Sequence, residues 1–208
     1  VEADAIFRIA SMTKPITSVA FMQLVEQGKV ALSDPVARYL PEFAKLGVFV
    51  SGGGNQPFVT RPPAAPMRII DLLRHTSGLT YSFQERTPVD AAYRKPDLES
   101  WSNNSSQSFI DGLATVPLDF DPGTSWNYSV STDVLGVIVE RISGQVLGDY
   151  FNEHIFALLG MVDTGFKVPE SESWRLPEAY GFHPVEKLKL VDHAGAESSW
   201  AKGFSLQS

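Results

Sequence analysis

The sequence contains no cysteine among its 208 residues. Disulfide bonds, a thiolate nucleophile and cysteine-ligated metal sites are therefore excluded, although this absence leaves the compartment undecided between the cytoplasm and an exported location. No stretch approaches about 18 uninterrupted apolar residues, so we expect no helix that spans a membrane.

Positive charge is also scarce, since 17 Lys and Arg residues face 24 Asp and Glu residues and the formal net charge is −7. Nucleic-acid binding depends on basic patches, and no basic run is present, so we expect no nucleic-acid partner. The four histidines include no His-x-x-x-His pair, and we expect no metal site. The run Gly52–Gly54 lacks the Gly-Lys-Ser/Thr sequel of a phosphate-binding loop, and we expect no cofactor.

What the sequence does contain is typical of a folded globular protein, with 43% apolar and 20% charged residues. We predict one domain over residues 1–208, because no Pro/Ser-rich linker divides the chain. Hydrophobic periodicity and helix stop signals predict a mainly helical protein with few strands. We expect helices over 12–28, 67–74, 106–115, 132–143 and 146–159, a loop over 47–66, irregular chain over 80–104, and one short strand over 187–191.

The helix expected over 12–28 is apolar nearly all round, which is typical of a central, buried helix, and Gly28 is expected to end it. Ser11 and Lys14 stand at its start. Residues at this spacing share a helix face, so the Lys14 amine can reach the Ser11 hydroxyl. Because buried ionisable groups are costly unless they are paired or used, we interpret Ser11 as a candidate nucleophile and Lys14 as its base.

The position of Ser11 at a helix start adds a second function for this residue. Free N–H groups at a helix N-terminus favour an anion, so the backbone N–H of Ser11 is a candidate oxyanion-hole donor. Pro15 removes an early helical hydrogen bond, and we therefore expect a distorted or 3₁₀ first turn.

Four segments together carry a resemblance to a known family. They are FRIASMTKPIT at 7–17, LLRHTSGL at 72–79, PGTSWNYS at 122–129 and LGMVDTGF at 159–166. In this order they resemble the serine beta-lactamase-like superfamily, which includes class C beta-lactamases, DD-peptidases and family VIII carboxylesterases.

The resemblance implies an α+β fold of the beta-lactamase/transpeptidase type. It also implies that this chain holds mostly the helical domain and the catalytic helix, with the N-terminal strands and much of the antiparallel sheet outside it. A chain that begins at Val1 is accordingly expected to be processed, trimmed or incompletely represented.

The resemblance gives Tyr128 the role of the Tyr in a Tyr-x-Asn motif, a general base and acid that relays protons among Ser11, Lys14 and the leaving group. Val130 stands where the family has Asn and cannot hydrogen-bond to a substrate amide. Several beta-lactamase-like esterases lack this Asn, so the departure favours ester substrates over lactams and peptides. Trp126, which precedes Tyr128 closely, is a candidate substrate contact.

A third motif of the family, Lys-Thr-Gly, His-x-Gly or Trp-Gly-Gly on a strand beside the nucleophile, normally follows the Tyr much later in the chain. His193-Ala194-Gly195 fits the letters but comes too early and in a loose tail. We therefore expect the true motif, and with it the second oxyanion donor, outside this chain. The chain alone is then expected to be a poor catalyst whose partner is the missing part of the same enzyme.

Our main interpretation is a serine hydrolase that cleaves small-molecule carboxylic esters through an acyl-enzyme. Alternatives are a beta-lactamase or D-Ala-D-Ala carboxypeptidase, an acyltransferase, and a non-catalytic binding module or fragment. A Ser/His triad that uses His75 is conceivable, but a structural histidine at a helix end fits the Arg-His-Thr-Ser-Gly turn better.

Overall fold

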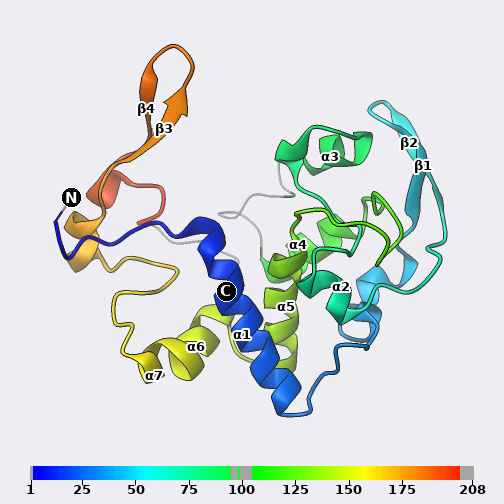
Figure 1. Cartoon of the computed structure of the whole chain (residues 1–208), viewed down its shortest axis with the longest axis horizontal. Helices are drawn as coiled ribbons and strands as arrows, with labels where there is room; N and C mark the ends of the chain where they lie inside the picture. Colours follow the sequence, from blue (N-terminus) through cyan, green and yellow to red (C-terminus); the bar gives the residue numbers. More distant parts are fainter. Residues whose placement is uncertain (1, 95–97, 99–104, 202–208) are drawn as a thin grey trace.

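Two long helices lie side by side at the centre of the molecule (Figure 1). In the computed structural model, which describes residues 2–94, 98 and 105–201, these are α1 (Thr13–Glu26) and α5 (Ser131–Ser143). The shorter helices are α2 (Ile69–Leu73), α3 (Pro88–Tyr93), α4 (Ser106–Leu113), α6 (Leu147–Phe151) and α7 (Ala157–Leu159). Short 3₁₀ segments cover Ala10–Met12, Val36–Arg38, Pro41–Lys45, Ser82–Gln84, Glu170–Arg175 and Gly195–Glu197. Within the described residues, no helix has the length and apolar character needed to cross a membrane.

Helix α1 buries one face, which corrects the expectation that it would be buried all round. Ala20, Phe21 and Leu24 are fully buried in the hydrophobic core. Val19 is 52% exposed and Met22 is 37% exposed. The apolar surface of the helix is therefore larger than the part that the other described residues cover.

Both ends of α1 follow signals in the sequence. The 3₁₀ turn at Ala10–Met12 confirms the distorted start that Pro15 predicts. At the other end Gly28 adopts a left-handed φ of +69°, and the N–H of Lys29 donates to the carbonyl of Leu24 at 3.0 Å. Glycine allows this conformation without a Cβ clash, and the bond satisfies a terminal carbonyl of the helix.

Helix α5 passes through the core, and all its residues from Val134 to Val139 are buried. Gly144, with a φ of +73°, ends the helix as expected. The helices predicted over 67–74, 106–115, 132–143 and 146–159 are all confirmed, although a π-helical turn at Asn152–Phe156 interrupts the last one.

The expected loop over 47–66 is wrong, because an antiparallel hairpin of β1 (Val48–Gly53) and β2 (Gln56–Arg61) forms there. Gly52 and Gly53 have φ values of +92° and +101°, and the pairing register shifts twice along the hairpin. Glycine-bearing bulges of this kind break the alternation by which a strand is recognised in a sequence.

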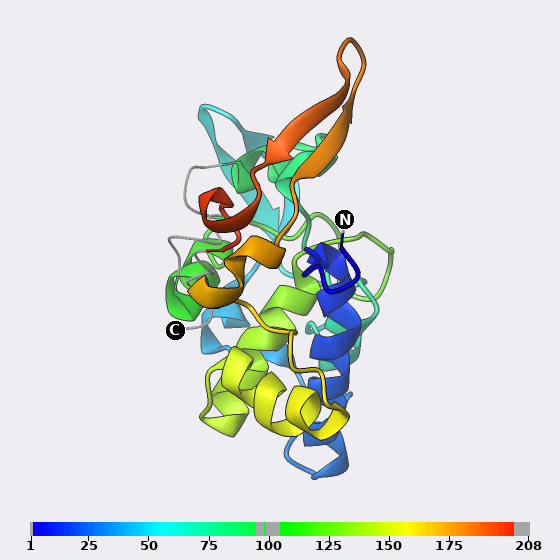
Figure 2. The same cartoon turned by 90° about the vertical axis from the view of Figure 1, so that its left-hand side faces the viewer.

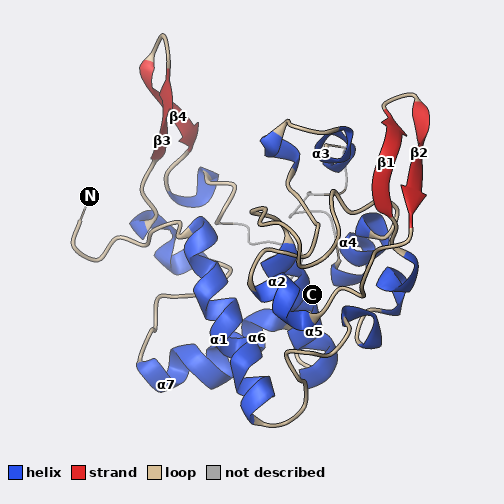
Figure 3. Cartoon of the chain, turned by 45° about the vertical axis from the view of Figure 1, so that its right-hand side comes forward, coloured by secondary structure: helices blue, strands red, loops and turns tan. Residues whose placement is uncertain are grey.

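The strand expected over 187–191 is confirmed as β4 (Lys187–Asp192), but its antiparallel partner β3 (Ala179–His183) was not predicted. This hairpin projects from the helical body (Figure 2). Figure 3 shows the two hairpins as the strands of an otherwise helical structure. The α+β class is confirmed, with two small two-stranded sheets in the described part of the chain.

Helix α3 also forms where irregular chain was expected. Its start is a capping box, in which the Thr87 hydroxyl accepts from the N–H of Asp90 at 3.2 Å and the Asp90 carboxylate accepts from the N–H of Thr87 at 3.1 Å. These reciprocal bonds satisfy two N–H groups at the helix start and stabilise a short helix. Residues 95–97 and 99–104 of that expectation lie outside the described residues.

We expect Gly78 to tolerate no side chain, because its φ is +87° and a Cβ would lie 2.4 Å from the carbonyl oxygen of Phe120. Gly28 has a similar φ of +69° but has nothing within 4 Å of such a Cβ. Gly78→Ala should therefore lower the free energy of unfolding by about 3 kcal/mol or more, against about 1 kcal/mol for Gly28→Ala. Urea denaturation followed by circular dichroism measures both, and equal losses would contradict the steric explanation.

Candidate active site

Ser11 stands on the turn that leads into α1, and its side chain is exposed. The preceding Ala10 has a φ of +42°, in the left-handed region that residues with a Cβ rarely adopt. A conformation of this kind costs about 1 to 3 kcal/mol and persists only where the surroundings hold it. The turn therefore presents Ser11 at the helix start in a backbone conformation that the free chain would avoid.

Lys14 lies one helical turn after Ser11 and points back toward it. Its Nζ donates to the Ser11 Oγ at 3.4 Å, a long hydrogen bond. The same ammonium group lies 5.1 Å from the ring centroid of Tyr128 and 5.5 Å from that of Tyr81. Aromatic faces attract cations at this distance, so the two rings hold the amine beside the serine.

Tyr128 reaches Ser11 from the segment that precedes α5. Its Oη donates to the Ser11 Oγ at 2.7 Å, across 117 positions of sequence. The structure therefore brings together the three side chains that the sequence singled out, and the Ser11 hydroxyl lies between the phenol and the amine.

Backbone and amide contacts fix the segment that carries Tyr128. The buried side chain of Asn127 donates through Nδ2 to the carbonyl of Leu79 at 3.1 Å, and its backbone N–H donates to the carbonyl of His75 at 2.8 Å. The side-chain amide of Gln84 donates to the carbonyl of Tyr128 itself. The phenol is thus placed by a segment with little freedom to move.

His75 packs its ring against the ring of Tyr128 and makes no hydrogen bond to Ser11. Its ring lies 5.0 Å from the Tyr128 ring, and its Nδ1 lies 3.3 Å from both the N and the Oγ of Ser129. Because the backbone N–H of Ser129 donates to Nδ1, the neutral ring carries its proton on Nε2. This arrangement fits the structural histidine rather than the Ser/His triad.

A chain of buried serine hydroxyls, which the sequence did not predict, begins beside His75 Nδ1. The Oγ atoms of Ser129 and Ser131 lie 2.6 Å apart, and those of Ser131 and Ser77 lie 2.7 Å apart. All three side chains are fully buried and bond one another, which removes the cost of burying them. Serines inside loop-like motifs carry no periodic signal, so their burial was not predictable.

Tyr81 is a second residue that the sequence did not single out. Its ring lies 5.4 Å from the Tyr128 ring, and its Oη donates to Asp133 at 2.9 Å. This bond joins the site to the first turn of α5.

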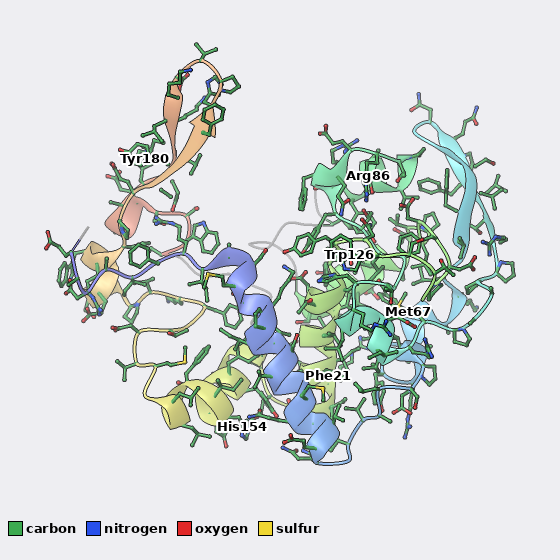
Figure 4. The ribbon with its side chains drawn as sticks, in the orientation of Figure 1. Phe21, Met67, Arg86, Trp126, His154 and Tyr180 are labelled. Carbon is green, nitrogen blue, oxygen red and sulfur yellow. The ribbon has the colours of Figure 1, made fainter. Side chains whose placement is uncertain are left out.

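Trp126 is 68% exposed and lies close to the start of α5 (Figure 4). Its ring lies edge-on to His75 at 6.4 Å. It is not among the described residues that line the cavity at Ser11, whereas Trp200 is. A substrate contact for Trp126 stays a prediction.

The segment His193-Ala194-Gly195 follows β4 and leads into a 3₁₀ turn, so it does not form a strand beside Ser11. Its His193 carbonyl accepts from the guanidinium of Arg8 at 2.8 Å. The position of the family's third motif outside this chain stays a prediction.

Val130, which stands at the position of the family's Asn, is fully buried directly before α5. Its backbone N–H donates to the carbonyl of Thr80 at 3.3 Å. The side chain therefore packs in the core and offers the cavity no polar group.

A cavity of about 540 Å³ opens at Ser11, Lys14 and Tyr128 and continues between α1 and α5. Its volume lies in the range of small-molecule sites. Across the residues that the structure describes, no group of three or more His, Cys, Asp or Glu side chains is placed to hold a metal ion.

The pKa of His75 is lowered by burial and, further, by the nearby positive charge of Lys14. Because the folded pKa lies below the unfolded value of about 6.5, the unfolded chain binds more protons as the pH falls. The stability that the neutral ring contributes is therefore complete above about pH 6.5 and is lost as the pH falls toward the folded pKa.

His75→Gln should accordingly flatten the fall in the free energy of unfolding between about pH 7 and pH 5. Denaturation curves over this range measure the effect. An unchanged slope in His75→Gln would contradict the assignment.

The Beta-lactamase family model matches residues 1–205 of the chain. Protein Rv1367c of Mycobacterium tuberculosis is 39% identical over 188 residues, which cover 90% of this chain and 46% of that protein. Esterase EstB of Burkholderia gladioli is 38% identical over 181 residues, 84% of this chain and 42% of that protein. The solved structure of EstCE1, a hydrolase with promiscuous acyltransferase activity, has a TM-score of 0.68 at 29% identity and covers 87% of this chain and 44% of its own.

The chain spans less than half the length of these relatives. The structural match agrees with the expected beta-lactamase/transpeptidase-like fold, and the family match confirms the resemblance carried by the four sequence segments. The chain therefore belongs to the beta-lactamase family, in the serine beta-lactamase-like superfamily that includes esterases.

Proposed function

We propose that this chain carries the nucleophile of a serine hydrolase that acts on carboxylic esters through an acyl-enzyme. The observation that carries the proposal is the contact of one serine hydroxyl with both a phenol and an amine. Tyr128 Oη lies 2.7 Å and Lys14 Nζ lies 3.4 Å from Ser11 Oγ. Serine is a weak nucleophile unless an adjacent base takes its proton, and this pair is positioned to do so.

The reaction then has two halves. In the first, Ser11 Oγ bonds to the ester carbonyl carbon, its proton passes to the pair Lys14–Tyr128, and the alcohol leaves with a proton from that pair. In the second, water attacks the acyl group, the pair takes the proton of the water and returns one to Ser11, and the carboxylic acid departs. The backbone N–H of Ser11 is the proposed donor to the oxyanion on this chain.

Two observations favour an ester over a lactam or peptide. Val130 is buried and leaves the cavity without the amide-binding Asn of the family. A site that lacks the hydrogen-bond partner of an amide loses discrimination in favour of amides. The relative EstB, which is 38% identical, is named an esterase.

An acyltransferase is the second candidate, because EstCE1 is described as a hydrolase with promiscuous acyltransferase activity. The chemistry at Ser11 is the same until the second half, where an alcohol replaces water as the acceptor. The exposed position of Ser11 leaves room for either acceptor.

Covalent labelling tests the nucleophile without requiring turnover. A fluorophosphonate probe should label the chain once, with loss of fluoride, and peptide mass spectrometry should find the adduct on Ser11. Ser11→Ala should abolish the label, and Ser18→Ala, the same change about two turns further on and inside α1, should retain it. A folded chain that is not labelled, or is labelled at another serine, would refute the proposal.

Substrate class is tested by comparing acylation by p-nitrophenyl butyrate with acylation by nitrocefin, each followed as the mass gained by the intact chain. We expect the ester to acylate Ser11 at least about tenfold faster, since the amide-binding partner is missing. The reverse order would instead favour a beta-lactamase.

A further inference from the structure

The cavity beside Ser11 extends from the nucleophile along the two central helices. It begins at Ser11 and Lys14, passes Thr17 on α1, and follows α5 from Thr132 to Glu140. The eight steps from Thr132 to Glu140 correspond to about 12 Å at a rise of about 1.5 Å per residue. The lining therefore extends away from the nucleophile along the two central helices, and we call this part of the cavity the channel.

A missing side chain keeps this channel open. Gly136 lies on the channel face of α5, and a Cβ there would lie 2.9 Å from Leu147 Cδ2 and 3.9 Å from Thr17 Cγ2. Both neighbours, together with Val137, also line the channel. Any larger residue at position 136 would push Leu147 into the space or fill it directly.

The charges along the channel exclude an anionic ligand end. Asp133 and Glu140 both line it, and Lys14 at its mouth is the only cation among the described lining residues. The Glu140 carboxylate accepts from the Ser106 hydroxyl at 2.5 Å and from the backbone N–H of Leu147 at 3.0 Å, so it is held in place. A second carboxylate on a ligand would meet like charge beyond the mouth.

An acyl chain fits this channel better than the alcohol of an ester does. The acyl group stays bonded to Ser11 Oγ through the intermediate, so it needs an enclosed space that continues from that atom. The alcohol has to leave, and the exposed side of Ser11 gives it a route. The walls that an acyl chain would touch are mostly apolar, including Phe109, Val137 and Leu147.

We infer that the channel is the acyl subsite and that it selects uncharged aliphatic acyl groups of medium length, with Gly136 as the residue that determines specificity. This inference rests on the proposed acyl-enzyme function. The close approach of Leu147 already accounts for a glycine at position 136, where Ala would otherwise be the better helix former. The inference adds that this glycine also sets the width of the channel.

The test measures acylation of this chain by p-nitrophenyl acetate, butyrate and hexanoate, as mass gained with release of p-nitrophenol. The second-order rate should rise about fourfold per added methylene, since each buried methylene contributes roughly 0.8 kcal/mol. The mono-p-nitrophenyl ester of adipic acid, which ends in a carboxylate, should react at least about tenfold more slowly than the hexanoate.

Gly136→Val should remove the preference for hexanoate over acetate, and Gly136→Ala should reduce it. Gly112→Ala is the control for the same change in another helix, because a Cβ at position 112 of α4 would lie 3.0 Å from Leu98 Cδ1, and neither residue is among the described residues that line the channel. It should keep the preference of the unmodified chain. Circular dichroism verifies folding, and Gly136→Ala carries the test if Gly136→Val does not fold.

A binding measurement separates this inference from the proposed function. Hexanamide should shift the methyl resonances of Leu147 and Val137 in the unmodified chain and in Ser11→Ala, with at least about tenfold weaker binding in Gly136→Val. Binding without labelling of Ser11 would sustain the channel and refute the hydrolase. Labelling of Ser11 without chain-length preference or hexanamide binding would sustain the hydrolase and overturn the channel.

Discussion

The contact between Ser11 Oγ and Tyr128 Oη, 2.7 Å long, is the constraint on which the candidate site depends. It joins the start of α1 to the segment before α5, and those two helices pack side by side in the core. The packing of these two helices therefore fixes the distance between the Ser11 hydroxyl and the Tyr128 phenol. The helix that begins beside Ser11 places Lys14 one turn away, and the rings of Tyr128 and Tyr81 hold its amine there.

Backbone hydrogen bonds join two of the four segments that carry the family resemblance, the one at 72–79 and the one at 122–129. The N–H of Gly123 donates to the carbonyl of Thr76 at 2.7 Å, and the N–H of Asn127 donates to the carbonyl of His75 at 2.8 Å. The segment at 72–79 therefore fixes the position of the segment at 122–129, which carries Tyr128. Much of what looks like a catalytic signature in the sequence thus holds the tyrosine in place.

The sequence predicted the long helices and the proximity of Ser11 and Lys14, because helical periodicity and the Ser11–Lys14 spacing are local signals. Tyr128 follows only from the resemblance to the family. The sequence did not predict the first hairpin, where glycines at 52 and 53 hide the strand pattern, or β3, whose aromatic residues Tyr180 and Phe182 lie on its exposed side. It also missed the channel beside α5, since a single glycine in a helix, Gly136, gives no sign of the space that it leaves. Those features depend on contacts between distant parts of the chain.

The central claim is that Ser11, Lys14 and Tyr128 act as one unit. The most direct measurement is a double-variant cycle on the rate of Ser11 phosphonylation by the fluorophosphonate probe, with Lys14→Met, Tyr128→Phe and both changes together. If the two groups handle the same proton, each single variant is slowed by about a hundredfold or more and the double variant is about as slow as the slower single one. Two effects that multiply, or single variants that react at the unmodified rate, would contradict the claim.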